Sequence, residues 1–296
     1  MNIMREKVKN IIDQELSAAN INISWTMDDI HVIPNMNTVL ERTSSDGVLS
    51  EALINHHFPQ VINEVELAHY TSYKSFESII KSKELRLYSI LKRIDEQEFL
   101  PFVEEHGLKG YLDEIEGEPY YKTLMKDLFY TSFTNNSVND EDYMWNYFGD
   151  NHSGVKIVFK LKVIKRRADL RPVLYHSNAI NPSTVIKSLS ERIFQECNRH
   201  FVLRGISRIG AFYLPLGYQL EKEEETRLLV KSWGEGVAHD MIENDGEYSY
   251  IPLKIGVGEN DFCEITISEV LVGNKCDKAK IRNILNQPDF ETVVVI

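Results

Sequence analysis

The sequence predicts an α+β fold with a mixed, mainly antiparallel sheet. Short runs of β-branched and aromatic residues, such as residues 128–134, are typical of strands. Segments with apolar residues at helical spacing lie between these runs. The two kinds of segment alternate irregularly, which favours α+β over a regular array of parallel strands and crossover helices.

The chain begins with an amphipathic helix. Met4, Val8, Ile11 and Leu16 recur at the spacing of one helix face. The following residues, 21–61, have only short apolar runs and are interrupted by prolines. We therefore predict an N-terminal helical extension over residues 1–65 and a main domain over residues 66–296.

The main domain shows a series of strand and helix signals. Strands are expected at residues 67–70, 85–90, 128–134, 155–161, 226–231, 264–272 and 292–296. Thr71 or Ser72 is a candidate cap for a helix after the first strand, and Asn139 or Asp140 for a helix after the third. A longer helix is expected to open at Asn181-Pro182. The acidic insert at residues 96–126 is expected to form a helix and a loop that can act as a lid.

Composition excludes several classes of protein. The 33 Lys and Arg residues against 45 Asp and Glu give a net charge of −12, which argues against a protein that coats nucleic acid or anionic lipid. We find no run of about 18 apolar residues and no signal-peptide pattern, so we expect no membrane segment. The three cysteines are too scattered for a disulfide framework, and we expect a cytoplasmic location.

The familiar catalytic motifs are absent. The sequence has no phosphate-binding GxxxxGK[ST] loop, no GxGxxG fingerprint, no HExxH zinc helix and no GxSxG elbow. His56 and His57 are adjacent, so their side chains diverge and form a poor chelate. We predict no metal site.

Three segments remain as candidates for a functional site. In LAHYTS, His69 at a strand end is followed by hydroxyl groups and a helix start, a combination that can bind an anionic or hydroxylated ligand. In YTSFT and the following MWNYFGDNHSG, hydroxyl and aromatic side chains can line a pocket for a flat ring. The alternatives are a structural histidine in the first segment and ordinary core aromatics in the second.

The third segment is EKEEETRLLV, which includes Glu223 and Glu225. In an extended chain these two carboxylates would point to one face and Glu224 to the other. Two carboxylates at a pocket edge can stabilise a cation or orient a hydroxyl group. The alternative is a solvated charged loop.

Together these segments resemble a bacterial family catalogued as domain of unknown function 2971, over residues 66–285. The matching segments are His69-Tyr70-Thr71, residues 83–89, Ser132-Phe133-Thr134, Met144-Trp145-Asn146-Tyr147, His152-Ser153-Gly154, residues 155–159, residues 223–227 and residues 267–273. The family's Asn-Asp-Pro step is replaced by Arg93-Ile94-Asp95, and the insert at 96–126 has no counterpart.

The layout of this family resembles the ADP-ribosyltransferase fold. The resemblance implies an NAD-consuming transferase or NAD glycohydrolase, in a bacterial toxin or phage-defence setting, with NAD as substrate. Glu225 would then stabilise an oxocarbenium-like state, with Glu223 supporting it or orienting the acceptor. The implied NAD-binding residues are His69, Tyr70, Thr71, Arg86, Tyr130, Ser132, Trp145, Tyr147 and His152.

Two alternatives stay open. One is a catalytically inactive sensor that binds a nucleotide or another ligand on the same fold. The other is a metal-dependent nuclease or hydrolase that uses the acidic cluster. The expected partners are NAD or a related nucleotide and a macromolecular acceptor, and the N-terminal region is a candidate for homodimer or protein contacts.

Overall fold

A computed structural model describes most of the chain. The described residues are 2–33, 37–42, 47–92, 100–105, 109–112, 114–115, 117–164, 168–175, 183–214, 221–232 and 241–296. The chain divides into two compact units, which are described one at a time. Unit 1 contains Met1–Pro59, Ile90–Asp127 and Val173–Tyr218, and unit 2 contains Gln60–Ser89, Leu128–Pro172 and Gln219–Ile296. None of the described helices is long and apolar enough to span a membrane.

Unit 1 is larger than the predicted N-terminal extension because two later segments pack into it. The phenol of Tyr111 donates to the backbone carbonyl of Leu203 at 3.0 Å, and the Phe102 ring lies 5.8 Å from the Tyr213 ring. The insert thus buries Phe102 and Tyr111 within unit 1. Residues 96–99, 106–108, 113 and 116 of the insert, and Asn181-Pro182, lie outside the described residues.

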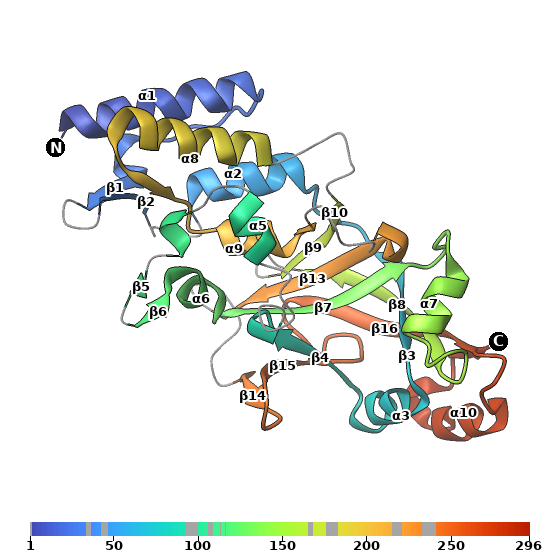
Figure 1. The fold of residues 1–296 in the computed structure, drawn as a ribbon. Helices are drawn as coiled ribbons and strands as arrows, with labels where there is room; N and C mark the ends of the chain where they lie inside the picture. The colour runs from blue at the N-terminus through green and yellow to red at the C-terminus, as the bar shows by residue number, and fades with distance from the viewer. Residues whose placement is uncertain are drawn as a thin grey trace. The chain divides into compact units, whose positions relative to one another are not determined.

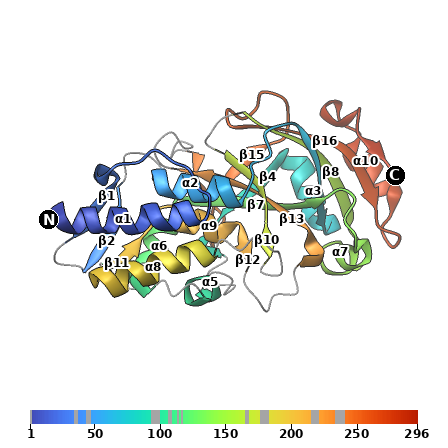
Figure 2. The same ribbon diagram turned by 90° about the horizontal axis from the view of Figure 1, so that it is seen from above.

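Two antiparallel helices and a small sheet form much of unit 1. Helices α1 (Asn2–Ala18) and α8 (Ser183–Cys197) lie side by side (Figures 1 and 2). The sheet has the order β1 (Ile30–Ile33), β2 (Thr38–Glu41), β11 (His200–Val202). The other elements of unit 1 are η1 (Met27–Asp29), α2 (Val48–His57), α5 (Leu100–Glu105), η3 (Lys109–Tyr111), β5 (Glu114–Ile115), β6 (Glu118–Pro119), α6 (Tyr120–Met125), β10 (Leu174–Tyr175), α9 (Ile206–Ala211) and β12 (Tyr213–Leu214).

His57, at the end of α2, is expected to make the protein less stable in acid. Its side chain is buried, and both ring nitrogens lack a hydrogen-bond partner among the described residues. Burial, and to a lesser extent the charge of His56, lowers the pKa of His57 to about 4. The unfolded chain binds this proton near pH 6.5, so stability is full above that pH and falls below it, by at most about 1.4 kcal/mol per pH unit.

The measurement is urea unfolding at pH 7 and pH 5. We expect His57→Phe to lose less stability between these values than the wild-type protein does. His56→Phe is the matched control, because His56 is exposed. Equal pH dependence in the two variants would contradict the prediction.

Unit 2 is built on one large sheet, which confirms the predicted class of a mixed, mainly antiparallel sheet with helices. The strand order is β14-β15-β4-β7-β3-β8-β16-β17, and β13 pairs with β7 and with β9. The strands are β3 (Val65–Thr71), β4 (Glu84–Ser89), β7 (Leu128–Asn135), β8 (Val155–Val163), β9 (Ala168–Pro172), β13 (Glu225–Lys231), β14 (Glu243–Asn244), β15 (Ser249–Lys254), β16 (Cys263–Val272) and β17 (Val294–Val295). The helices are α3 (Tyr73–Ser82), α7 (Glu141–Tyr147), η4 (Glu221–Glu223), α10 (Lys278–Leu285) and η6 (Pro288–Phe290).

The sheet splits along one edge of β7. β13 pairs with β7 along residues 128–134, so it occupies one full edge of that strand. On the opposite edge, β4 pairs only with Phe129 and Tyr130, and β3 pairs only with Thr134 and Asn135. Residues 131–133 therefore face a gap between β3 and β4, where the ladder hydrogen bonds need other partners.

The two faces of this sheet have different roles. One face packs with α3 and α10 into the main core, through side chains such as Phe76, Phe159 and Ile281. On the other face, Ala68 and Tyr70 of β3 pack with Met144 of α7 in a smaller apolar cluster. Phe129 and Phe133 of β7 belong to the main core, so the alternation of side chains along β7 places Ser132 and Thr134 beside this smaller cluster, and the candidate site lies there.

Candidate functional site

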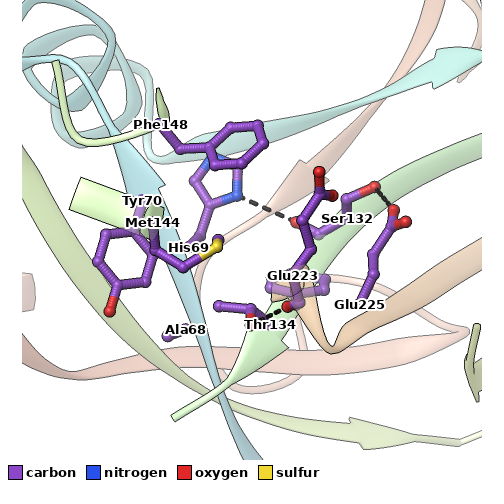
Figure 3. A pocket seen from close by; sticks show the side chains of 10 residues that line it. Ala68, His69, Tyr70, Ser132, Thr134, Met144, Phe148, Glu223 and Glu225 are labelled. Carbon is purple, nitrogen blue, oxygen red and sulfur yellow. Dashed lines mark hydrogen bonds between the residues drawn. The ribbon is translucent and has the colours of Figure 1, made fainter. Parts of the chain in front are cut away.

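A cavity of about 80 Å³ lies where β3 separates from β7 (Figure 3). Its lining residues come from β3, β7, α7, η4 and β13, and they are Ala68, His69, Tyr70, Ser132, Phe133, Thr134, Met144, Phe148, Glu223 and Glu225. Five of the predicted site residues are among them. The structure thus brings together His69, Ser132 and Glu225, although 63 residues separate the first pair and 93 the second.

His69 fills the split in the sheet. Its Nδ1 lies 3.1 Å from the backbone carbonyl oxygen of Ser132, at the stretch of β7 that no strand pairs on that edge. A carbonyl only accepts, so Nδ1 carries the proton and donates it. Burial lowers the pKa of His69, and the bond to Ser132 opposes this shift. The imidazole is therefore neutral at pH 7, and its Nε2 is an acceptor.

Glu225 is held by a hydrogen bond and a bidentate ion pair. The Ser132 hydroxyl donates to Glu225 Oε1 (Figure 3). Arg227, two residues along the same face of β13, donates from Nε to Oε1 at 2.6 Å and from Nη2 to Oε2 at 2.5 Å. Both side chains of the pair are buried, and the Arg227 guanidinium lies 5.8 Å from the Tyr130 ring. The carboxylate is thus fixed in position beside the hydroxyl.

Glu223 reaches the cavity by a different backbone path from the one predicted. The sequence suggested an extended chain, but Glu223 ends the short helix η4, and Glu224 has a left-handed backbone with φ of +43°. The Glu223 carbonyl accepts from the Thr134 hydroxyl, while the Glu224 carboxylate accepts from the Asn139 backbone amide at 3.0 Å. The turn therefore leaves Glu223 and Glu225 at the cavity and Glu224 away from it.

Helix α7 is tied to the sheet by a buried lysine. Lys156 of β8 donates to Glu141 at 2.7 Å and to the Asn136 carbonyl at 2.8 Å. The Tyr70 hydroxyl also donates to Glu141, at 3.2 Å. Asp140 caps the helix by accepting from the Tyr143 amide at 3.1 Å. These bonds hold α7 over the cavity.

The side chains of α7 and its C-terminal cap that line the cavity differ from the predicted ones. Trp145 and Tyr147 were predicted, but the lining residues are Met144 and Phe148. The spacing of four between Met144 and Phe148 was a usable signal, because residues i and i+4 share a helix face.

Trp145, Tyr147 and His152 do not line the cavity. Trp145 stacks on His152 with centroids 5.8 Å apart and meets the Tyr70 ring edge-on at 5.1 Å. Tyr147 is 72% exposed. Trp145 therefore packs between Tyr70 and His152 and does not form part of the cavity surface.

Thr71, Arg86 and Tyr130 also lie outside the cavity lining. Thr71 is buried at the end of β3, and Ser72 supplies the cap of α3 by accepting from the Ser75 amide at 3.2 Å. Arg86 lies on β4, 3.5 Å from Asp245 and 4.4 Å from the Tyr250 ring. Its side chain is 45% exposed, so it is accessible from solvent.

Gly154 is expected to be essential for the packing of β3. A Cβ at this position would lie 2.1 Å from the backbone oxygen of Thr71. The preceding Asp150, Asn151 and His152 all have left-handed backbones, which turn the chain sharply into this contact. We expect Gly154→Ala to destabilise the protein by about 1–3 kcal/mol, because the backbone of β3 or β8 has to shift. Urea unfolding measures the change in the free energy of unfolding, and a loss smaller than about 0.5 kcal/mol would contradict the prediction.

The cavity offers groups for binding a ligand and for stabilising charge. His69 Nε2 and the Glu225 carboxylate are acceptors suited to hydroxyl groups, and Met144 and Phe148 offer apolar surface for a flat ring. Within the described part of the chain, no group of three or more His, Cys, Asp or Glu is placed to hold a metal ion. The metal-dependent alternative thus gains no support from the described residues.

Comparison with known proteins identifies no relative. No family model matches the chain, and neither a curated protein nor a solved structure matches it.

Proposed function

We propose that the chain is an NAD-consuming enzyme of the ADP-ribosyltransferase type. The observation that carries this proposal is the connected set His69, Ser132 and Glu225 around one cavity. Three distant segments supply an imidazole, a hydroxyl and a carboxylate. The split of the sheet at β7 gives them their common position.

The cavity suits one end of a dinucleotide. Its volume of about 80 Å³ is well below the roughly 300–1,000 Å³ of sites that enclose a whole ligand. It can receive the nicotinamide ribose, whose hydroxyl groups would donate to His69 Nε2 and to Glu225. The pyrophosphate and the adenosine would then lie outside, where the exposed Arg86 is a candidate phosphate partner.

The residues present favour breakage of the bond between nicotinamide and ribose. The bonding electrons leave with the nicotinamide nitrogen, and positive charge develops on the ribose. The fixed Glu225 carboxylate stabilises this charge. Ser132 orients the carboxylate, and a ribose hydroxyl can take the place of the Ser132 hydroxyl as a donor to Oε1. An acceptor group or water then adds to the ribose carbon and loses its proton.

One observation favours a second candidate, a binding module without turnover. The bidentate pair with Arg227 neutralises much of the charge of Glu225. A neutralised carboxylate still accepts hydrogen bonds from a ligand, but it stabilises a cation less strongly.

The test is incubation of the full chain with NAD, alone and with a cell lysate. Nicotinamide release, with or without transfer of labelled ADP-ribose to a lysate component, supports the enzyme. Thermal stabilisation by NAD without release supports the binding module. Neither release nor stabilisation would overturn both.

A further inference from the structure

Helix α7 carries an exposed aromatic face beside the mouth of the cavity. We define this face as Tyr143, Tyr147 and Phe148. The Tyr143 and Tyr147 rings lie 4.5 Å apart, and the Tyr143 and Phe148 rings lie 6.4 Å apart. Tyr147 is 72% exposed and Phe148 is 40% exposed, although Phe148 also lines the cavity. Adjoining exposed rings are a feature of interaction surfaces.

Acidic residues stand on α7 and on η4, whose Lys222 contacts the Tyr143 ring. Asp140 and Asp142 stand at the start of α7, and Glu221 and Glu223 stand on η4. Burial raises the pKa of Tyr143, and the charges of Glu223, Tyr147 and Asp140 raise it further. In residues 140–148 and 221–224, Lys222 is the single cation. An anionic partner would be repelled here, and a cationic one attracted.

Lys222 already demonstrates this mode of binding within the chain. Its ammonium group lies 2.8 Å from the Asp140 carboxylate and 5.5 Å from the centre of the Tyr143 ring. A cation over an aromatic ring beside a carboxylate is a favourable arrangement. The neighbouring Tyr147 offers a second ring of the same kind, and it is more exposed.

We propose that the aromatic face of α7 is a docking surface for a basic segment of a partner protein, with a lysine or arginine side chain on the Tyr147 ring. The occupant is argued from charge complementarity, since aromatic rings bind cations and the flanking carboxylates add attraction. Binding at this face does not require NAD turnover.

The test is binding of fluorescent hexa-arginine to the full chain without NAD, followed by anisotropy at two salt concentrations. We expect binding that weakens as salt rises. Tyr147→Ala is expected to weaken it at least about threefold, and Tyr147→Phe, which keeps the ring, less than about twofold. Phe194→Ala is the control, because Phe194 is an exposed aromatic residue of unit 1 that stacks on His200.

A second pair of variants distinguishes the effect of a carboxylate on α7 from the effect of the net charge of the chain on hexa-arginine binding. Asp142→Asn and Glu247→Gln each remove one exposed carboxylate, but only Asp142 belongs to α7. We expect Asp142→Asn alone to weaken hexa-arginine binding, by about twofold. Equal binding by wild type and Tyr147→Ala would overturn the proposal.

Three other results would also overturn the proposal. Two of them are binding of hexa-glutamate, or of a single-stranded oligonucleotide, that is tighter than the binding of hexa-arginine. The third is a dimer of the chain that dissociates when Tyr147 is replaced by alanine. If the wild-type chain releases nicotinamide from NAD but does not bind hexa-arginine, this surface alone is refuted. If the wild-type chain binds hexa-arginine but releases no nicotinamide, the proposed enzyme alone is refuted.

Discussion

Glu225→Gln is expected to lower the rate of nicotinamide release from NAD by about 10²–10³-fold, the range seen when one preorganised electrostatic contact is removed. Glutamine keeps the shape of the side chain and still accepts from Ser132, but it lacks the negative charge with which the proposed mechanism stabilises a ribose cation. NAD binding should change much less than the rate, because hydrogen bonds to the ribose remain. The measurement is nicotinamide release at saturating NAD, together with the NAD concentration that gives half the maximal rate.

Glu224→Gln is the matched control for this experiment. Glu224 is the neighbouring carboxylate, and its side chain accepts from Asn139 rather than facing the cavity. The same change in net charge is therefore made one residue away from the site, and the rate should stay within about twofold of wild type. Equal rates in wild type and Glu225→Gln would contradict the role of Glu225. Glu225→Gln also weakens the buried ion pair with Arg227, so Ser132→Ala provides a second test that leaves this pair in place. We expect Ser132→Ala to lower the rate of nicotinamide release less than Glu225→Gln does.

Arg227→Met is expected to destabilise the folded state by about 3–5 kcal/mol. Arg227 is 2% exposed and binds Glu225 through two hydrogen bonds, so its removal leaves a buried carboxylate without its cation. Methionine fills a similar volume, so the loss reports mainly on charge rather than on a cavity. Urea unfolding at pH 7 measures the change.

Two variants make this result specific. Arg86→Met removes an arginine whose side chain is 45% exposed and which faces Asp245, and it should cost less than about 1 kcal/mol. The double variant Glu225→Gln/Arg227→Met removes both charges and should be more stable than Arg227→Met alone. If Arg227→Met lowers the free energy of unfolding by less than about 1 kcal/mol, the buried pair of Arg227 and Glu225 is unimportant for the stability of the fold.

Local patterns predicted much of unit 2. The apolar and aromatic run of residues 128–134 became β7, and the alternating segment from Val155 became β8. The caps at Ser72 and Asp140 were also among the predicted candidates. These features depend on neighbours in the chain, because side-chain alternation and helix capping are properties of a few consecutive residues.

Long-range packing was harder to predict. The longer helix expected from Asn181-Pro182 ends at Cys197, and Phe201, which lies at helical spacing from Cys197, is part of β11. An apolar residue four positions after Cys197 fits a helix face as well as a strand, and pairing with β2 decided between them. The insert at 96–126 showed no pattern that assigns it to unit 1, because the contact of Tyr111 with Leu203 joins residues 92 positions apart.

By itself the sequence determined the α+β class, most of the strands and helices that carry the candidate residues, and the three segments from which the site is drawn. The tertiary structure alone decided that β3 and β4 share one edge of β7, which opens the gap that His69 fills. It also decided that Glu223 and Glu225 meet the cavity through a left-handed turn at Glu224, and that Met144 and Phe148 face it in place of Trp145 and Tyr147. Periodicity assigns a residue to a face, but strand pairing across many residues decides what that face meets.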